Sequence, residues 1–580
     1  MKKANFYWIA FLFFIITYLV PLAPRPMISP DEFRYAQVPR EMIESGNWSA
    51  PHLLHMRYFE KPVLGYWMTA ASFKVFGENK FALRFPMALM AGATAFMIAL
   101  LVHQTIGDEH IAAMASMLFM TSGLVYGVGT FAVLDLPVTA LITGISCSAF
   151  QAMREPRTTK RRIFLLILCG IFAGLAFMTK GFLAFAVPGL TILGFIFWER
   201  RWKELYKLPW IPLVVMLAVV LPWAIRVHQL EPDFWHYFVM EEHWNRFTGG
   251  AESEHPAPFW YFIPVLIAGV FPGALLWLPA CCTLGKQRFA AITGTSLARF
   301  CICATVLPFL FFSASSGKLA TYILPCFPFL AILAAMGIAS YFRTGGSYRV
   351  FHTTMSFWGG LLALGGVLWM VFCFQDLAVL ELKPDDLLTL ELLQKNGLPV
   401  GIAAMICGIV LFVIRKNWRY RMYAFFAGIA VLINAALWST PEGLLADKTP
   451  EKALKELFAE DGIDTEEAII ITLQRYMHAV AWCSNRSNLL IYGRPGELDY
   501  GNEAAEKNGE PGNLLDDDRF MELINRENRP DILLVHRSQD KRFDLLFDIR
   551  GDELHHNNFM TLHRLKPGAK IVSRQILTAE

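Results

Sequence analysis

Apolar stretches of about 20 residues recur along most of this chain, and each is long enough to cross a bilayer as an α-helix. Only 17% of its 580 residues are charged and 55% are hydrophobic, whereas about a quarter of the residues of a soluble chain are charged. The pattern predicts a polytopic α-helical membrane protein with about 13 spans. The predicted spans cover residues 5–24, 83–103, 110–128, 133–152, 162–179, 181–198, 208–226, 257–280, 299–316, 319–341, 352–374, 398–414 and 420–440.

Short basic loops indicate the orientation of these spans. Basic segments occur at residues 1–3, 154–162, 200–207, 286–299, 343–349 and 415–421. With this number of spans they all fall on one side, which the positive-inside rule assigns to the cytoplasm. The N-terminus is then cytoplasmic, and the opposite side receives residues 25–82, 226–256, 375–397 and everything after about residue 441. The net charge of +3 is too small to indicate a nucleic-acid partner.

Composition divides the chain after residue 440. We predict a transmembrane catalytic domain over residues 1–440, with juxtamembrane helices within 29–78, and a small α/β domain over 441–580. In the second part, strands are predicted at 468–473, 489–492 and 531–536, and helices at 450–460, 474–484, 518–527 and 538–547. The sequence has no P-loop and no GxGxxG run, so ATP-driven transport and a nucleotide cofactor are not expected.

The first loop on the outer side contains a predicted helix start. Ser29, Pro30 and Glu32 fit a capping box, with Ser29 as N-cap, and Gly46 is a suitable residue to follow the helix end. This helix is too short and too polar to span, so we expect it to lie along the membrane surface. A second such helix is predicted after Pro62.

Charged residues gather in this loop and in the other outward segments. Asp31, Arg34 and Tyr35 share one helix face by their i, i+3, i+4 spacing. The other members of the set are Tyr58, Glu60, Lys61, Asp135, Lys180, His243, Arg246, Lys318 and Tyr322. Some of these residues also have a structural reading: helix-dipole compensation for Asp31, headgroup anchoring for Arg34, a cap or buried pair for Asp135, and snorkelling for Lys180. Ionisable groups at a membrane are costly, so a cluster of them favours function.

The combination of charges favours chemistry on a phosphate. Arg and Lys side chains suit phosphate oxygens. Paired carboxylates suit a general base or an electrostatic stabiliser of an oxocarbenium-like centre. A phosphate stabilised by cations leaves without a general acid. The periplasm lacks nucleotide sugars, so a sugar donor on that side of the membrane would need a lipid carrier.

Five runs of sequence carry a resemblance to a known family. They are residues 30–36 (PDEFRYA), 57–62 (RYFEKP), 242–247 (EHWNRF), 317–325 (GKLATYILP) and 491–501 (IYGRPGELDYG). On these motifs the chain resembles the GT-C glycosyltransferases, which use polyprenyl-phosphate sugars, and within them the bacterial lipid A aminoarabinose transferases. The last run is the narrowest and favours the aminoarabinose branch. Phe33 and Ala320 depart from the residues usual in the family, Thr and Pro.

The resemblance implies transfer of 4-amino-4-deoxy-L-arabinose from undecaprenyl phosphate to a phosphate of lipid A, on the periplasmic face of the bacterial inner membrane. This modification of lipopolysaccharide implies resistance to cationic peptides such as polymyxin. It implies that Asp31 is the leading catalytic carboxylate and that Asp135 assists. The residues it assigns to substrate binding are Arg34, Tyr35, Tyr58, Lys61, Lys180, Arg246, Lys318 and Tyr322, and Glu60 and His243 are candidates for a divalent metal.

Three alternatives remain open on the sequence alone. A GT-C enzyme could use another lipid-linked sugar and a protein or glycan acceptor. A lipid-sugar transporter would place its charges and broken helices near mid-membrane rather than at the outer rim. A binding or scaffold protein would not need the gathered acids and cations. The role of Asp31 is also open, because a phosphate acceptor with a second pKa of about 6 is already largely ionised at neutral pH.

Overall fold

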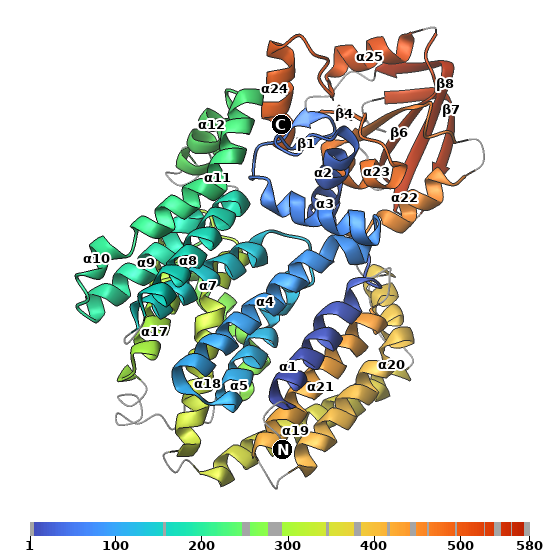
Figure 1. Ribbon diagram of the computed structural model, residues 1–580. Helices are drawn as coiled ribbons and strands as arrows, with labels where there is room; N and C mark the ends of the chain where they lie inside the picture. Colours follow the sequence, from blue (N-terminus) through green and yellow to red (C-terminus); the bar gives the residue numbers. More distant parts are fainter. Residues whose placement is uncertain are drawn as a thin grey trace. The chain divides into compact units, whose positions relative to one another are not determined.

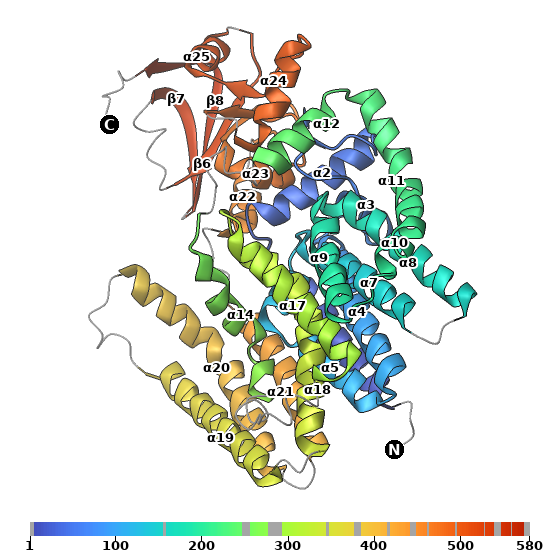
Figure 2. The ribbon, with the colours of Figure 1, turned by 90° about the vertical axis from the view of Figure 1, so that its left-hand side faces the viewer.

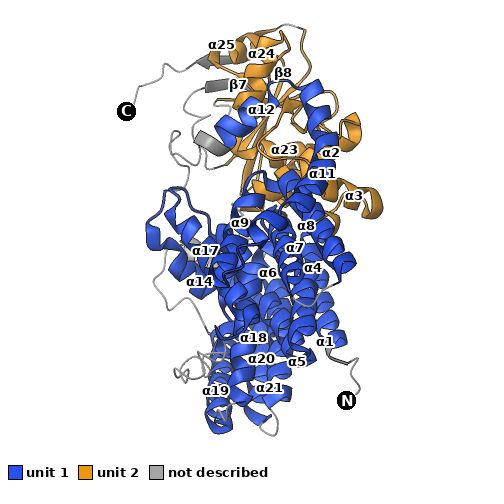
Figure 3. Cartoon of the chain, turned by 60° about the vertical axis from the view of Figure 1, so that its left-hand side comes forward, with its two compact units in different colours: residues 1–25, 84–441 blue, residues 26–83, 442–580 orange. Residues whose placement is uncertain are grey.

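The computed structural model divides the chain into two compact units, coloured separately in Figure 3. The helical unit comprises Met1–Arg25 and Arg84–Pro441, and the α/β unit comprises Pro26–Leu83 and Glu442–Glu580. Residues 26–83 are therefore grouped with the C-terminal part, and the predicted domain boundary after residue 440 stays a prediction. The structure describes residues 5–154, 158–245, 256–276, 293–343, 347–375, 384–414, 418–440, 448–460, 463–493, 496–526, 528–538, 547–557 and 559–573.

Long apolar helices form most of the helical unit. Within the described ranges, nine helical segments are long and apolar enough to cross a membrane, by length and composition. They contain α4 (Lys80–Ile106), α7 (Asp135–Met153), α8 (Thr159–Lys180), α10 with α11 (Glu204–Lys207 and Trp210–Leu230), α17 (Ser296–Ala314), η6 with α18 (Ala320–Cys326 and Phe327–Arg343), α19 (Tyr348–Cys373), α20 (Pro384–Val413) and α21 (Trp418–Ser439). Each coincides with a predicted span, which confirms the polytopic helical class.

Four further apolar helices are shorter than a full span. They are Tyr7–Leu22, α5 (Glu109–Met120), α9 (Leu183–Trp198) and Phe259–Val270, and all four lie on predicted spans. The span predicted at 110–128 is divided after α5, where the Thr121 hydroxyl donates to the Met117 carbonyl (2.8 Å) and the Ser122 hydroxyl to the Leu118 carbonyl (2.9 Å). Such side-chain bonds compete with the helical pattern. A count of 13 spans therefore stays a prediction.

Helices α19 and α20 pack along each other, as Figures 1 and 2 show from two sides. A Cβ added at Gly366 of α19 would lie 2.6 Å from the Gly401 carbonyl oxygen of α20. Small residues let two helix backbones approach this closely, which is how helices associate in an apolar solvent. Helix α20 begins earlier than the predicted span, at Pro384 rather than near residue 398.

A six-stranded sheet is the centre of the α/β unit. Its strand order is β5-β4-β3-β6-β8-β7. Strand β3 (Ile469–Leu473) pairs in parallel with β4 (Leu490–Tyr492) and β6 (Ile532–Arg537), with Ile471 opposite Leu490 and Leu534. Strand β5 (Leu514–Leu515) continues the parallel part, while β8 (Met560–Ser573) runs antiparallel to β6 and to β7 (Phe547–His556).

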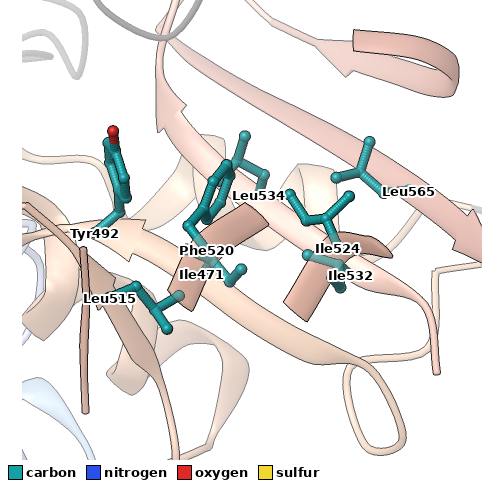
Figure 4. Packing of buried hydrophobic residues seen from close by; sticks show 8 residues of the cluster. All are labelled: Ile471, Tyr492, Leu515, Phe520, Ile524, Ile532, Leu534 and Leu565. Carbon is teal, nitrogen blue, oxygen red and sulfur yellow. The ribbon is translucent and has the colours of Figure 1, made fainter. Parts of the chain in front are cut away.

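The apolar cluster beside this sheet joins its strands to a helix, α25 (Asp517–Asn525). Figure 4 shows its eight buried residues, which are Ile471, Tyr492, Leu515, Phe520, Ile524, Ile532, Leu534 and Leu565. The three predicted strands are confirmed as β3, β4 and β6, because each is a short apolar run between polar segments. Predicted helices at 450–460, 474–484 and 518–527 correspond to α22 (Glu451–Phe458), α23 (Met477–Ser484, preceded by a 3₁₀ turn) and α25.

Several elements of the α/β unit were not predicted. Most of the predicted helix 538–547 lies outside the described residues, and Phe547 begins a strand, β7. Strands β7 and β8 carry many polar residues, so hydropathy gave no signal for them. The helix α24 (Asp499–Lys507) and the two-residue strand β5 were also missed.

The predicted surface helices are both present in the α/β unit. Helix α2 runs from Asp31 to Ser45 and ends before Gly46, whose φ of +68° suits glycine. Helix α3 (Leu64–Phe76) follows Pro62, and a short hairpin of β1 (His52–Leu53) and β2 (Met56–Arg57) separates the two helices.

The predicted capping box at the start of α2 is wrong. Pro30 is the N-cap residue, and no side chain caps the helix. The buried carboxylate of Glu32 reaches past Ser29 and accepts a hydrogen bond from the Ile28 amide at 3.0 Å. The Ser29 amide itself donates to the Lys448 carbonyl at 2.7 Å. A long-range partner within the α/β unit has thus replaced the local one.

Candidate functional site

Arg34 is the centre of the charged group in the α/β unit. It lies one turn after Asp31 on α2, and the two side chains form an ion pair, which their shared helix face allows. Its other guanidinium nitrogen lies 2.5 Å from a carboxylate oxygen of Glu497. The Arg34 side chain is 18% exposed and that of Asp31 39% exposed. The Asp31 carboxylate is thus held by a cation and still reaches solvent.

Glu497 was not among the predicted site residues, yet it has three charged or polar partners. Besides Arg34, it accepts a hydrogen bond from the Tyr58 hydroxyl at 3.0 Å and contacts Nε2 of His478 at 2.5 Å. Burial raises the pKa of this carboxyl, but the His478 and Arg34 charges and hydrogen bonds outweigh it and hold the pKa well below its ordinary range. Glu497 is therefore an anion at neutral pH.

The Glu497 segment depends on two glycines of the quoted 491–501 run. Gly496 has a φ of +55°, and a Cβ there would overlap the Gln474 side chain. A Cβ at Gly501 would lie 2.6 Å from the Arg57 carbonyl oxygen, so α24 approaches the β2 backbone closely. The segment that carries Tyr58 is fixed by this approach. The narrow motif therefore has a physical role in positioning Glu497 and Tyr58.

Two stacked tyrosine rings, one from α2 and one from α3, lie next to Arg34. The Tyr35 ring stacks on Tyr66 with centroids 5.9 Å apart, and the Arg34 guanidinium lies 5.5 Å from the Tyr35 centroid. Burial raises the pKa of Tyr58 and of Tyr66 well above the ordinary value, so both stay neutral donors. The Tyr58 hydroxyl is already bonded to Glu497. Tyr58 thus positions the Glu497–Arg34 pair in this structure.

Glu60 and Lys61 lie together after the hairpin. The Lys61 ammonium donates to the Glu60 carbonyl at 2.8 Å and lies 4.0 Å from its carboxylate. Among the described residues there is no group of three His, Cys, Asp or Glu side chains that could hold a metal ion. The His243 side chain, the other predicted metal ligand, lies outside the described residues, as does the whole of Arg246.

The helical unit contains a second acid–cation pair. Asp135 is the first residue of α7 and Lys180 the last of α8, and Nζ of Lys180 lies 2.8 Å from a carboxylate oxygen of Asp135. A carboxylate at a helix N-terminus and an ammonium at a C-terminus are each favoured by the helix dipole. Gly181, with a φ of +64°, ends α8 and confirms the break predicted there. The two side chains are about 15% exposed, so an isolated charge here would be costly.

The two remaining predicted residues lie beside the start of η6. Nζ of Lys180 is 6.0 Å from the centroid of the Tyr322 ring, which places Tyr322 next to the Asp135–Lys180 pair. Lys318 is buried, and its ammonium donates to the carbonyls of Ala257, at 2.9 Å, and Ser315. Two of the three N–H donors of its ammonium group are thus bonded to backbone carbonyls. In this structure Lys318 connects segments of the helical unit.

Sequence reasoning named Asp31, Arg34, Asp135 and Lys180 as site residues, but it did not pair Asp135 with Lys180 and it missed Glu497 and His478. Glu497 lies in a motif that the sequence analysis quoted, and an acid directly after Gly496 was the available signal. His478 gave none, because it lies in an apolar helical run, MHAVAWCS, where a buried structural histidine is the ordinary reading. Chemically, each unit offers a carboxylate paired with a cation. Such pairs can bind a phosphate or stabilise a developing positive charge.

Comparison with known proteins identifies the family. Residues 4–238 match the family model described as dolichyl-phosphate-mannose-protein mannosyltransferase. The chain is 35% identical to the undecaprenyl phosphate-alpha-4-amino-4-deoxy-L-arabinose arabinosyl transferase of Enterobacter sp. (strain 638), over 86% of this chain and 88% of that protein. It is 32% identical to the protein of the same name from Erwinia tasmaniensis, over 96% and 98%.

A solved structure confirms the fold. ArnT from Cupriavidus metallidurans, crystallised bound to undecaprenyl phosphate, superposes with a TM-score of 0.79 at 20% identity and covers 98% of this chain and 99% of that one. At this identity the likeness establishes the shared fold. The two long matches to named enzymes establish more. The chain belongs to the family of undecaprenyl phosphate-alpha-4-amino-4-deoxy-L-arabinose arabinosyl transferases and is a multi-pass membrane glycosyltransferase.

Proposed function

We propose that this enzyme transfers 4-amino-4-deoxy-L-arabinose from undecaprenyl phosphate to a phosphate group of lipid A, at the periplasmic face of the bacterial inner membrane. The observation that carries the proposal is the similarity to named aminoarabinose transferases over nearly the whole chain. The N-terminus is then cytoplasmic and the C-terminal α/β domain periplasmic, in agreement with the basic loops.

The charged pairs support this chemistry. Loss of undecaprenyl phosphate from the sugar leaves an anion, which cations stabilise without a proton donor. We assign Arg34 and Lys61 to phosphate binding in the α/β unit and Lys180 to phosphate binding in the helical unit. Arg246 and Lys318 keep the same predicted assignment, and Tyr35 and Tyr322 are assigned to positioning the sugar. Tyr58 acts through Glu497, because its hydroxyl is bonded there.

Asp31 is assigned to electrostatic stabilisation of positive charge at the sugar. The acceptor phosphate has a second pKa of about 6 and is already largely ionised at neutral pH, so a base has little to remove. One Asp31 oxygen is bonded by Arg34, and its side chain is 39% exposed, so a carboxylate oxygen remains for substrate. Asp135, paired with Lys180, is assigned a supporting role.

The test uses the purified chain in proteoliposomes that contain the lipid-linked aminosugar and lipid A, with wild type and Asp31→Asn compared across pH. We expect transfer by the wild type and a loss of about 100-fold in kcat in the variant, since removal of one charge-stabilising group has that order of effect. The pH profiles should have the same shape.

The matched control is Asp518→Asn, an exposed carboxylate of the same unit, which should leave the rate unchanged. A wild-type rate that falls steeply at low pH, with no such fall in Asp31→Asn, would instead make Asp31 a general base. No transfer by the wild type would contradict the proposed function.

A further inference from the structure

A cavity of about 300 Å³ lies within the α/β unit, beside the Glu497 cluster. Its lining includes Lys448, Arg475, Tyr476, His478 and Glu497. Binding pockets for small molecules begin at about this volume, which suits the head of one sugar and not a lipid chain. Every lining residue belongs to the α/β unit, and none was predicted as a site residue.

Positive charge is available in this cavity. Lys448 and Arg475 are exposed, and no hydrogen bond or ion pair from either side chain occurs among the described residues. His478 is only 2% exposed, and within the same part of the chain its Nδ1 has no hydrogen-bond partner while Nε2 contacts Glu497. His478 therefore holds Glu497 in the cavity wall and is itself closed to solvent.

Among the lining residues, Lys448 and Arg475 are cations and Glu497 is the single acid. Both oxygens of Glu497 already have partners: one accepts from Arg34 and Tyr58, and the other contacts His478. The lining therefore has more positive than negative charge. Tyr476, which is 6% exposed, also lines the cavity.

We infer that this cavity binds a sugar phosphomonoester, with Lys448 and Arg475 on the phosphate. Arginine and lysine are the side chains that bind phosphate with charge-assisted hydrogen bonds. The inference deepens the proposed function and rests on it for the source of the ligand, which is then the phosphorylated sugar head of the acceptor. The same carboxylate, Glu497, connects the cavity to Arg34.

The test measures binding of glucosamine 1-phosphate to the full chain in lipid nanodiscs by calorimetry, with no donor or acceptor present. The test variant is Lys448→Gln/Arg475→Gln. The control, Lys507→Gln/Arg519→Gln, removes the same charge from exposed positions of the same unit outside the cavity. We expect a loss of affinity of at least about tenfold in the test variant and less than twofold in the control, since each charged hydrogen bond is strong.

Two further arms identify the ligand class. Glucosamine without phosphate and inorganic phosphate alone should each bind at least tenfold more weakly than the sugar phosphate. Equal binding of inorganic phosphate would overturn the sugar assignment, and equal losses in both double variants would overturn the site. In the transfer reaction, the test variant should raise the KM for lipid A with kcat and the donor KM unchanged. A raised donor KM would contradict the acceptor assignment.

The binding arms keep the two proposals separate. Sugar-phosphate binding that depends on Lys448 and Arg475 supports the cavity even where the wild type transfers no aminosugar to lipid A. Transfer by the wild type with no such binding supports the proposed function and rejects the cavity.

Discussion

Glu497→Gln removes one charge from the centre of the α/β unit and keeps the shape of the side chain. In the native chain this carboxylate contacts Arg34, Tyr58 and His478, and it is 16% exposed. Removal of one partner from a buried ion pair costs about 3 kcal/mol, because the remaining charge is left without compensation. Asp31 still faces Arg34, so the loss should not exceed this value.

Amide hydrogen exchange of the full chain in nanodiscs measures this loss of stability locally, in the helices that carry the partners of Glu497. The amides of α2 and α23, which carry Arg34 and His478, exchange through local opening. A loss of about 3 kcal/mol corresponds to exchange that is roughly 100-fold faster. Glu510→Gln is the matched control, because Glu510 pairs with Arg57 on the surface at 3.1 Å and is 54% exposed. Exposed pairs contribute up to about 1 kcal/mol, or a factor of about five.

The pH dependence of the difference gives a second check. The pKa of Glu497 is lower in the folded chain than in the unfolded one, where it is about 4.3. Its stabilising contribution is therefore fully present above that value and is lost as the pH falls toward the folded pKa. The gap between wild type and Glu497→Gln should be constant from about pH 6 to 8 and shrink below about pH 4. Equal exchange in the two Gln variants, or a gap that grows in acid, would refute this reasoning.

Three other outcomes are expected. Asp135→Asn and Lys180→Met should each lower thermal stability and transfer. In a double-mutant cycle, the double variant should be more stable than the sum of the two single losses predicts, by about 1–3 kcal/mol. Additive losses would show that the pair is not coupled. Gly501→Ala should destabilise the α/β unit by about 1–3 kcal/mol in thermal unfolding, because its Cβ would meet the Arg57 carbonyl; an unchanged melting temperature would contradict the close approach. If Glu60 binds a divalent cation, EDTA should lower transfer in the wild type and Glu60→Gln should abolish that response; insensitivity of the wild type to EDTA would reject the predicted metal.

The helical class could be predicted because hydropathy depends on local composition. The limits of the spans were less predictable, since Thr121 and Ser122 divide one of them through bonds to their own backbone. In the α/β unit, apolar strands such as Ile469–Leu473 carried a clear pattern. Strands β7 and β8 carried none, because they contain many polar residues and their conformation depends on the pairing of β8 with β6 and of β7 with β8.

The site shows the same contrast between local and distant contacts. The sequence predicted that Asp31 and Arg34 share a helix face, and this spacing allows the ion pair that they form. The contact of Arg34 with Glu497 joins residues that are 463 positions apart, and no local pattern specifies it. The capping box failed for a related reason, since Ser29 is bonded to Lys448, a distant residue, rather than to its own helix.

Mass spectrometry of lipid A tests the central claim most directly. The measurement compares bacteria that lack their own aminoarabinose transferase and carry the donor lipid, with and without this chain, and with the Asp31→Asn variant expressed at the same level. We expect lipid A to gain one aminopentose with the wild-type chain and to stay unmodified with the variant. An unchanged spectrum with the wild-type chain, at normal expression and donor levels, would contradict the account.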